Sequence, residues 1–199
     1  LEPNWPAIED VLKHQAPPDV FLLVHYFGKA ADATRAAAFC KNTGALLIED
    51  AAHALIAHGD MGCLGDGIFY CPHKVLAAPD GAILVHRHPL LTTSALDEQQ
   101  RGDVPSTWLT KRIVQKLLPA AAMRYRVRQL PGFPIDLPGE PLDLQVSASS
   151  IGQSLINRYA DRLTAITTNR KRAAASWRAA FKAHGGPYIA FFSEEEEGP

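Results

Sequence analysis

The chain has 199 residues, which is enough for one domain with a hydrophobic core or slightly more. Hydrophobic residues make up 47% of the chain and charged residues 21%, as is ordinary for a globular soluble protein. The formal net charge of -1 gives no broad basic field, so nucleic acid is not an expected partner. The 3 cysteines contain no CxxC pair, which favours a reducing compartment and predicts a cytoplasmic protein.

Neither end of the sequence resembles a membrane or export segment. No apolar run approaches the roughly 18–20 residues that a membrane-spanning helix needs, so no membrane partner is expected. The first residues lack the basic and apolar regions of a signal peptide. There is no starting Met and the sequence stops abruptly after a run of glutamates, so we expect the chain to be an excerpt of a longer protein.

The first part of the chain reads as a helix followed by a strand. Pro3 and Pro6 precede apolar residues at helical spacing, which predicts a short helix that ends before residues 16–19. A continuous apolar run over 20–27 then predicts a strand buried on both faces, and Gly28 marks its end.

Alternation of helix and strand continues after residue 30. Residues 32–44 are rich in alanine and predict a helix, with Asp32 near its start and Gly44 at its C-cap. Further strands are predicted at 45–50, 65–71 and 81–86. Strand, helix and strand at this spacing indicate a βαβ unit and therefore a mostly parallel sheet of the α/β class. The segment between the last two strands is too short for a helical crossover, so these strands are predicted to be antiparallel neighbours or separate sheet elements.

Three regions follow from the change in composition along the chain. We predict a partial large domain over 1–130, whose last part is helical with a break at Pro119. A Pro/Gly linker is predicted over 131–146. Residues 147–199 are predicted to form one long helix, up to residue 186, and the start of an incomplete small domain.

Polar side chains follow three of the predicted strands. In parallel α/β sheets, ligands bind outside the carboxyl ends of the strands. A carboxylate and an amine at that edge, Asp50 and Lys74, can therefore face one ligand. Pyridoxal phosphate needs this pair, because a lysine amine binds its aldehyde covalently and a carboxylate keeps its pyridine nitrogen protonated.

Four short motifs carry a resemblance to a known family. They are VHYFG at 24–28, EDAAH at 49–53, GCLGD at 62–66 and FYCPHK at 69–74. Together they resemble the DegT/DnrJ/StrS family of fold-type I pyridoxal phosphate enzymes, which are mostly aminotransferases acting on nucleotide-linked keto sugars. The resemblance extends over roughly residues 18–192.

The resemblance implies a role for individual residues and for partners. Asp50 would pair with the pyridine nitrogen, His53 would contact the region of the ring hydroxyl, and Lys74 would bind the cofactor and move the proton. Cys71 stands where relatives use a serine to bind the phosphate, and a thiol is a weaker donor than a hydroxyl. The implied partners are a nucleotide sugar, an amino acid donor and, in the whole protein, a second copy in a homodimer.

Two further pairs of residues are candidates of a different kind. Tyr26 and His25, at the end of the first strand, are predicted to line the substrate region. His86 and His88 could share one face of a strand, but no further ligands stand out, so we expect no metal site.

Two other functions stay open. A sugar dehydratase of the same cofactor class is one, although some such members lack the lysine that this chain keeps. A degenerate or truncated homologue used for binding or assembly is the other, and Cys71 together with the missing flanking segments favours it.

Overall fold

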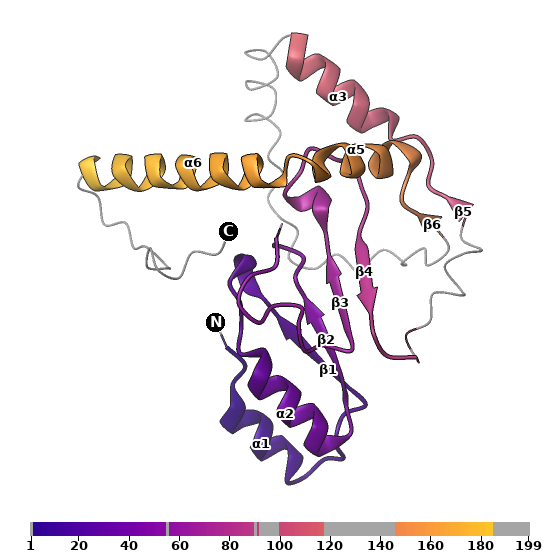
Figure 1. Cartoon of the computed structure of the whole chain (residues 1–199), viewed down its shortest axis with the longest axis vertical. Helices are drawn as coiled ribbons and strands as arrows, with labels where there is room; N and C mark the ends of the chain where they lie inside the picture. Colours follow the sequence, from indigo (N-terminus) through magenta and orange to yellow (C-terminus); the bar gives the residue numbers. More distant parts are fainter. Residues whose placement is uncertain (1, 55, 90, 92–99, 118–145, 185–199) are drawn as a thin grey trace.

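A four-stranded sheet forms the centre of the molecule (Figure 1). The computed structural model describes residues 2–54, 56–89, 91, 100–117 and 146–184. The strands lie in the order β1-β2-β3-β4. β1 pairs with β2 and β2 with β3 in parallel, whereas β3 and β4 are antiparallel. The predicted mostly parallel α/β sheet and its antiparallel last pair are thus confirmed. The strands are Val20–Val24, Leu46–Asp50, Gly67–Tyr70 and Ile83–His86.

Local signals in the sequence define the two helices that precede β2. Helix α1, Trp5–Leu12, starts at Asn4, whose side chain accepts a hydrogen bond from the backbone N–H of Ala7. Helix α2, Ala33–Thr43, starts at Asp32 in the same way. It ends at Gly44, whose φ of 78° is the left-handed conformation that glycine adopts without steric cost.

The core lies between these helices and one face of the sheet. Leu23 on β1 and Leu47 on β2 are fully buried against α1 and α2. Trp5, Phe21 and Phe39 extend this cluster, with the Phe21 and Phe39 ring centroids 4.9 Å apart. Such burial of large apolar side chains supplies most of the stabilisation of a layer like this.

The opposite face of the sheet is more open than the sequence predicts. Val20 and Leu22 point to this face and are 51% and 52% exposed. The prediction of a strand buried on both faces is therefore wrong for the described residues. β1 is the edge strand of this sheet, and only one of its faces packs against α2.

The apolar run at 20–27 is also not one strand. β1 ends at Val24, and Tyr26–Gly28 form the short helical turn η1. Phe27 and Gly28 have φ angles of 57° and 81°. Two successive left-handed residues cannot continue a strand, so the chain turns here.

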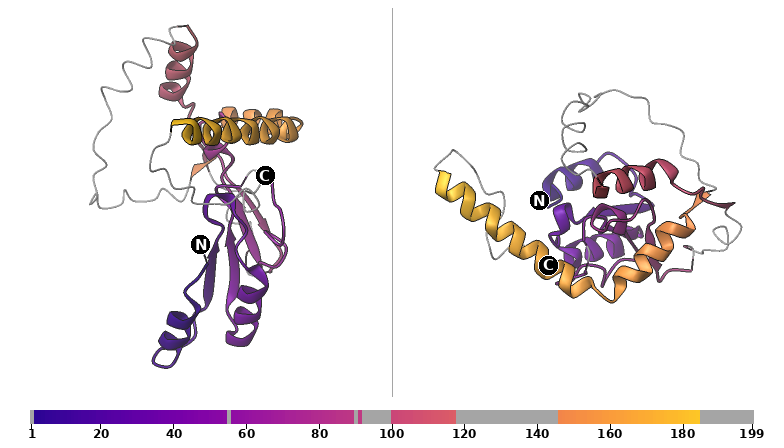
Figure 2. Two further views of the ribbon diagram at one scale, coloured as in Figure 1. Left: turned by 90° about the vertical axis from the view of Figure 1, so that its left-hand side faces the viewer. Right: turned by 90° about the horizontal axis from the view of Figure 1, so that it is seen from above.

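The C-terminal part of the described chain is helical. Helices α5, Ser150–Ala160, and α6, Leu163–His184, meet at an angle that is plain in Figure 2. The predicted single helix over this region is therefore wrong. Helix α3 is described over Ser106–Leu117, and the predicted break at Pro119 lies outside the described residues. None of the helices within the described ranges is long and apolar enough to cross a membrane.

A second, two-stranded sheet joins the start of this region to the residues before α3. Strands β5, Gln100–Arg101, and β6, Val146–Ser147, pair in parallel. The predicted linker over 131–146 lies outside the described residues, apart from its last residue. The division into a large domain, a linker and a small domain therefore stays a prediction.

Candidate functional site

Three strands end side by side at one edge of the sheet, and a polar residue or turn follows each of them. The register pairs Val24 with Asp50, and Asp50 with Phe69. The turn η1 therefore lies next to the end of β2, and the turn η2, Pro72–Lys74, lies beyond the end of β3. The residues predicted from the ends of the strands thus come from neighbouring segments.

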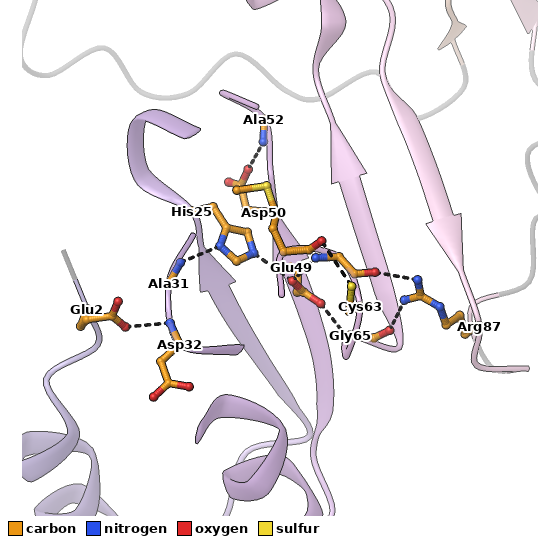
Figure 3. A network of polar contacts seen from close by, with 12 residues as sticks. Glu2, His25, Ala31, Asp32, Glu49, Asp50, Ala52, Cys63, Gly65 and Arg87 are labelled. Carbon is orange, nitrogen blue, oxygen red and sulfur yellow. Dashed lines mark hydrogen bonds and ion pairs between the residues drawn. The ribbon is translucent and has the colours of Figure 1, made fainter. Parts of the chain in front are cut away.

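Asp50 is the last residue of β2 and is half-buried. Its Oδ1 accepts a hydrogen bond of 2.8 Å from the backbone N–H of Ala52, which fixes the orientation of the carboxylate (Figure 3). Its register partner Phe69 lies on the same face of the sheet, away from α1 and α2. The second oxygen, Oδ2, can accept a further donor on this open side.

Lys74 closes η2 and is exposed. Its backbone N–H donates to the carbonyl of Cys71 at 3.0 Å, which holds the turn. Burial raises the pKa of the Cys71 thiol, the positive charge of Lys74 lowers it, and the negative charge of Asp50 raises it. The net shift is upward, so the thiol stays neutral near pH 7. Cys71 therefore lies within electrostatic range of both the Lys74 amine and the Asp50 carboxylate.

Helix α5 packs against the turn that carries Lys74. Asp80, in the Pro-Asp-Gly turn that follows, accepts a hydrogen bond of 3.1 Å from the backbone N–H of Ser149 at the start of α5. A side chain on Gly81 would meet Ile156 of α5 at 2.6 Å, so glycine permits this close approach. The contact between α5 and η2 was not apparent from the sequence, because 69 residues separate Asp80 from Ser149.

The turn η1 supports His53. The Phe27 and His53 rings stack with their centroids 5.9 Å apart and an interplanar angle of 8°. A Cβ on Gly28 would lie 3.1 Å from the backbone oxygen of His53, so the two segments are in close contact. Tyr26 is 47% exposed at this turn. His25 is only 1% exposed beneath it, and it can therefore act on a substrate only through its neighbours.

Glu49 is a buried carboxylate with three donors, and sequence reasoning did not assign it a role. It is 0% exposed and accepts hydrogen bonds from the backbone N–H of Gly62 at 2.7 Å, from that of Gly65 at 2.6 Å and from His25 Nε2 at 2.9 Å. Nδ1 of His25 accepts from the backbone N–H of Ala31 at 3.0 Å, so the ring proton is on Nε2. Burial acts to raise the pKa of Glu49, but these hydrogen bonds outweigh burial and hold the pKa below its ordinary value.

Arg87 binds the same loop from the other side. Its two terminal nitrogens donate to the backbone oxygens of Gly65 at 2.9 Å and of Gly62 at 2.6 Å. Figure 3 shows the loop between the carboxylate and the guanidinium group. We call Glu49, His25, Arg87 and these two glycines the Glu49 network.

The Glu49 network should give the protein a specific sensitivity to acid. Since the pKa of Glu49 is lower in the folded than in the unfolded protein, its contribution to stability is present above pH 4.5 and is lost as the pH falls through the folded pKa. We expect Glu49→Gln to lower the free energy of unfolding at pH 7 by about 1–3 kcal/mol, as for a lost hydrogen-bonded charge. The difference should shrink toward low pH in urea denaturation of the intact protein. The exposed Glu9→Gln is the matched control, and an equal loss at all pH values would contradict the prediction.

Comparison with known proteins places the chain in a family. The model of the DegT/DnrJ/EryC1/StrS aminotransferase family matches residues 4–130, more than half of the sequence. The chain belongs to this family. This confirms the resemblance read from the four motifs, and every candidate site residue lies within the matched range.

Two individual proteins resemble parts of the chain. One is the dTDP-4-dehydro-2,3,6-trideoxy-D-glucose 4-aminotransferase of Saccharopolyspora spinosa, which is 29% identical over 151 residues. That match covers 64% of this chain and 39% of the relative, so the chain spans about two fifths of the relative's length. The other is the aminotransferase TlmJ from Streptoalloteichus hindustanus, with a TM-score of 0.38 and 26% identity over 46% of this chain and 28% of that one.

The residues at the edge of the sheet fit two ends of pyridoxal phosphate. Asp50 keeps Oδ2 available for a protonated pyridine nitrogen, and Lys74 offers an exposed amine for the aldehyde. The neutral thiol of Cys71 is compatible with a phosphate but is a weak donor to it. For metals, the described ranges contain no group of three His, Cys, Asp or Glu side chains that could hold an ion.

Proposed function

We propose that the intact protein is a pyridoxal phosphate-dependent aminotransferase that transfers an amino group from an amino acid to a nucleotide-linked keto sugar. One observation carries the proposal. Asp50 ends β2 and Lys74 lies in the turn beyond the end of the neighbouring parallel strand β3, and Cys71 is within electrostatic range of both charges, in a chain of an aminotransferase family.

Each residue has a chemical role in this proposal. Asp50 accepts the hydrogen bond of the protonated pyridine nitrogen, and Lys74 binds the aldehyde and, when released, moves the proton at the reacting carbon of the substrate. Pyridoxal phosphate, when bound, withdraws electrons from that carbon. His53, supported by Phe27, contacts the ring hydroxyl region, and Cys71 contacts the phosphate.

The class of substrate rests on the relative. The S. spinosa protein is named for a dTDP-linked keto sugar, and it shares 29% identity with this chain. Tyr26, half-exposed on the turn η1, is the residue we propose for contact with this substrate. We further propose that the intact protein is a cytoplasmic homodimer, as the family resemblance and the cysteine usage imply.

The test uses the intact protein, pyridoxal phosphate, glutamate and a dTDP-linked 4-keto sugar. We expect an absorption band near the edge of the visible range on adding the cofactor, and formation of an amino sugar detected by mass spectrometry. A sugar that loses water and gains no nitrogen would favour the dehydratase. A protein with no cofactor band would favour the non-catalytic binding or assembly homologue.

A further inference from the structure

The Glu49 network joins segments that lie far apart in the sequence. Glu49 lies 24 residues from His25, 13 from Gly62 and 16 from Gly65. Arg87 lies a further 22 residues beyond Gly65. The proposed function gives none of these residues a contact with the reacting groups. They are nevertheless bonded to the two segments, the turn η1 and the Gly62–Gly65 loop, that flank Asp50 and His53.

One side of the network holds the loop between His53 and β3. The backbone N–H groups of Gly62 and Gly65 donate to one carboxylate, and their carbonyls accept from one guanidinium group. The peptide units on both sides of each glycine are thus bonded to a charged partner. A Cβ on Gly65 would lie 2.8 Å from Oε1 of Glu49, so the loop approaches the carboxylate as closely as glycine allows.

The other side holds the turn η1. The backbone N–H of His25 donates to the carbonyl of Asp50 at 2.9 Å, and its ring donates to Glu49. His25 is therefore bound to two consecutive residues of β2. The ring also accepts from Ala31, so both ends of the segment from 25 to 31 are fixed. This segment carries Phe27, on which the ring of His53 stacks.

A buried carboxylate lowers the stability of the fold unless its oxygens accept hydrogen bonds, because the charge loses its hydration. An apolar side chain would fill the same space without this loss of free energy. Glu49 is fully buried and has three donors, so its charge is satisfied. A fully satisfied polar network of this kind favours one arrangement of the segments that it joins. The charge therefore serves to place those segments.

We infer that Glu49, His25 and Arg87 are positioning residues, which hold the turn η1 and the Gly62–Gly65 loop so that Asp50 and His53 face one ligand. The effect on cofactor binding rests on the proposed function. The placement of the turn and the loop does not, and it can be measured without any cofactor.

Two variants of the intact protein test the inference. Arg87→Met removes the donors to the loop carbonyls, and Glu49→Gln removes the charge that joins the loop to His25. The control is Arg170→Met, which changes an exposed arginine on α6. All measurements are made at a temperature where circular dichroism shows every variant to be folded. Arg87→Lys gives a milder version of the first variant, because a single ammonium group replaces only part of the two-pronged contact.

Without cofactor, we expect faster amide hydrogen exchange at Gly62 and Gly65 in Arg87→Met. In Glu49→Gln we expect a weaker NMR contact between the Phe27 and His53 rings as well. With pyridoxal phosphate, both variants should bind about tenfold to 100-fold more weakly, the loss typical when a residue that orients a binding group is removed. Arg87→Lys should lie in between, and the control should match the wild type.

Each contrary result has a separate meaning. Unchanged exchange at the two glycines and an unchanged Phe27–His53 contact would overturn the inference. Loosened segments with an unchanged cofactor affinity would also overturn it, since the network would then be structural only. A wild type that binds no cofactor would contradict the proposed function, and the exchange and ring-contact measurements would still decide whether the network places the two segments.

Discussion

Replacing Lys74 with alanine is expected to abolish the absorption band of the bound cofactor in the intact protein. The exposed amine of η2 is the nucleophile that the proposal assigns to the aldehyde, and alanine has no substitute for it. The same amine moves the proton at the substrate carbon, so kcat should fall by at least about 10²- to 10⁴-fold, as for the loss of a general acid–base group. Absorption spectra and initial rates with glutamate and a dTDP-linked keto sugar measure both effects.

Lys13→Ala is the matched control for this change. Lys13 is exposed on the segment after α1 and forms a surface ion pair with Asp10 at 3.1 Å. Its loss should change neither the spectrum nor the rate, because exposed pairs contribute little. A Lys74→Ala protein that keeps the wild-type band would show that another amine binds the cofactor.

The second large effect is expected for Asp50→Asn. The amide keeps an oxygen that can accept the hydrogen bond from the backbone N–H of Ala52, so the fold at the end of β2 should persist. The negative charge is lost, and with it the charge-assisted hydrogen bond to the pyridine nitrogen, which is worth about 1.5–3 kcal/mol. At 1.36 kcal/mol per factor of ten, kcat should fall by about 10- to 150-fold.

A pH profile and a surface control separate this effect from misfolding. Asp10→Asn removes an exposed charge of α1 and should leave kcat unchanged. In Asp50→Asn, circular dichroism should match the wild type while kcat stays low across the pH range. An unaltered kcat in a variant that binds cofactor normally would show that Asp50 does not contact the pyridine nitrogen.

Local signals in the sequence allowed many of the helices and strands to be predicted. Asp32 and Gly44 mark the two ends of α2 by capping, which depends only on neighbouring residues. The apolar run over 20–27 was predicted as one strand, because hydrophobicity alone does not distinguish a strand from an apolar turn. The left-handed Phe27 is held by its surroundings, including the stacked ring of His53, and these contacts are invisible in the local sequence.

The break between α5 and α6 had no sequence signal. Asp161, at the end of α5, keeps right-handed helical angles, and neither glycine nor proline lies there. The backbone N–H of Arg162 donates to the carbonyl of Tyr159, three residues earlier, which makes a tighter turn than that of an α-helix. Such a change of direction depends on tertiary packing, so periodicity alone predicts one continuous helix.

The candidate site was predictable in part, because the carboxyl ends of neighbouring parallel strands meet at one edge. From this rule the sequence predicts Asp50 and Lys74 at one edge of the sheet, and the structure has β2 and β3 as parallel neighbours. One signal for the Glu49 network was present but unused. Glu49 lies two residues after Leu47 on β2 and so shares its buried face, and a charge on a buried face requires a partner. The contribution of Arg87 had no such signal, because it depends on where β4 ends relative to the loop.

A crystal structure of the intact protein grown with pyridoxal phosphate tests the central claim most directly. We expect one cofactor at the edge of the sheet, with its former aldehyde carbon bonded to Nζ of Lys74 and its pyridine nitrogen within hydrogen-bond distance of an Asp50 carboxylate oxygen. A cofactor attached to another lysine, or a ring whose nitrogen faces away from Asp50, would contradict it.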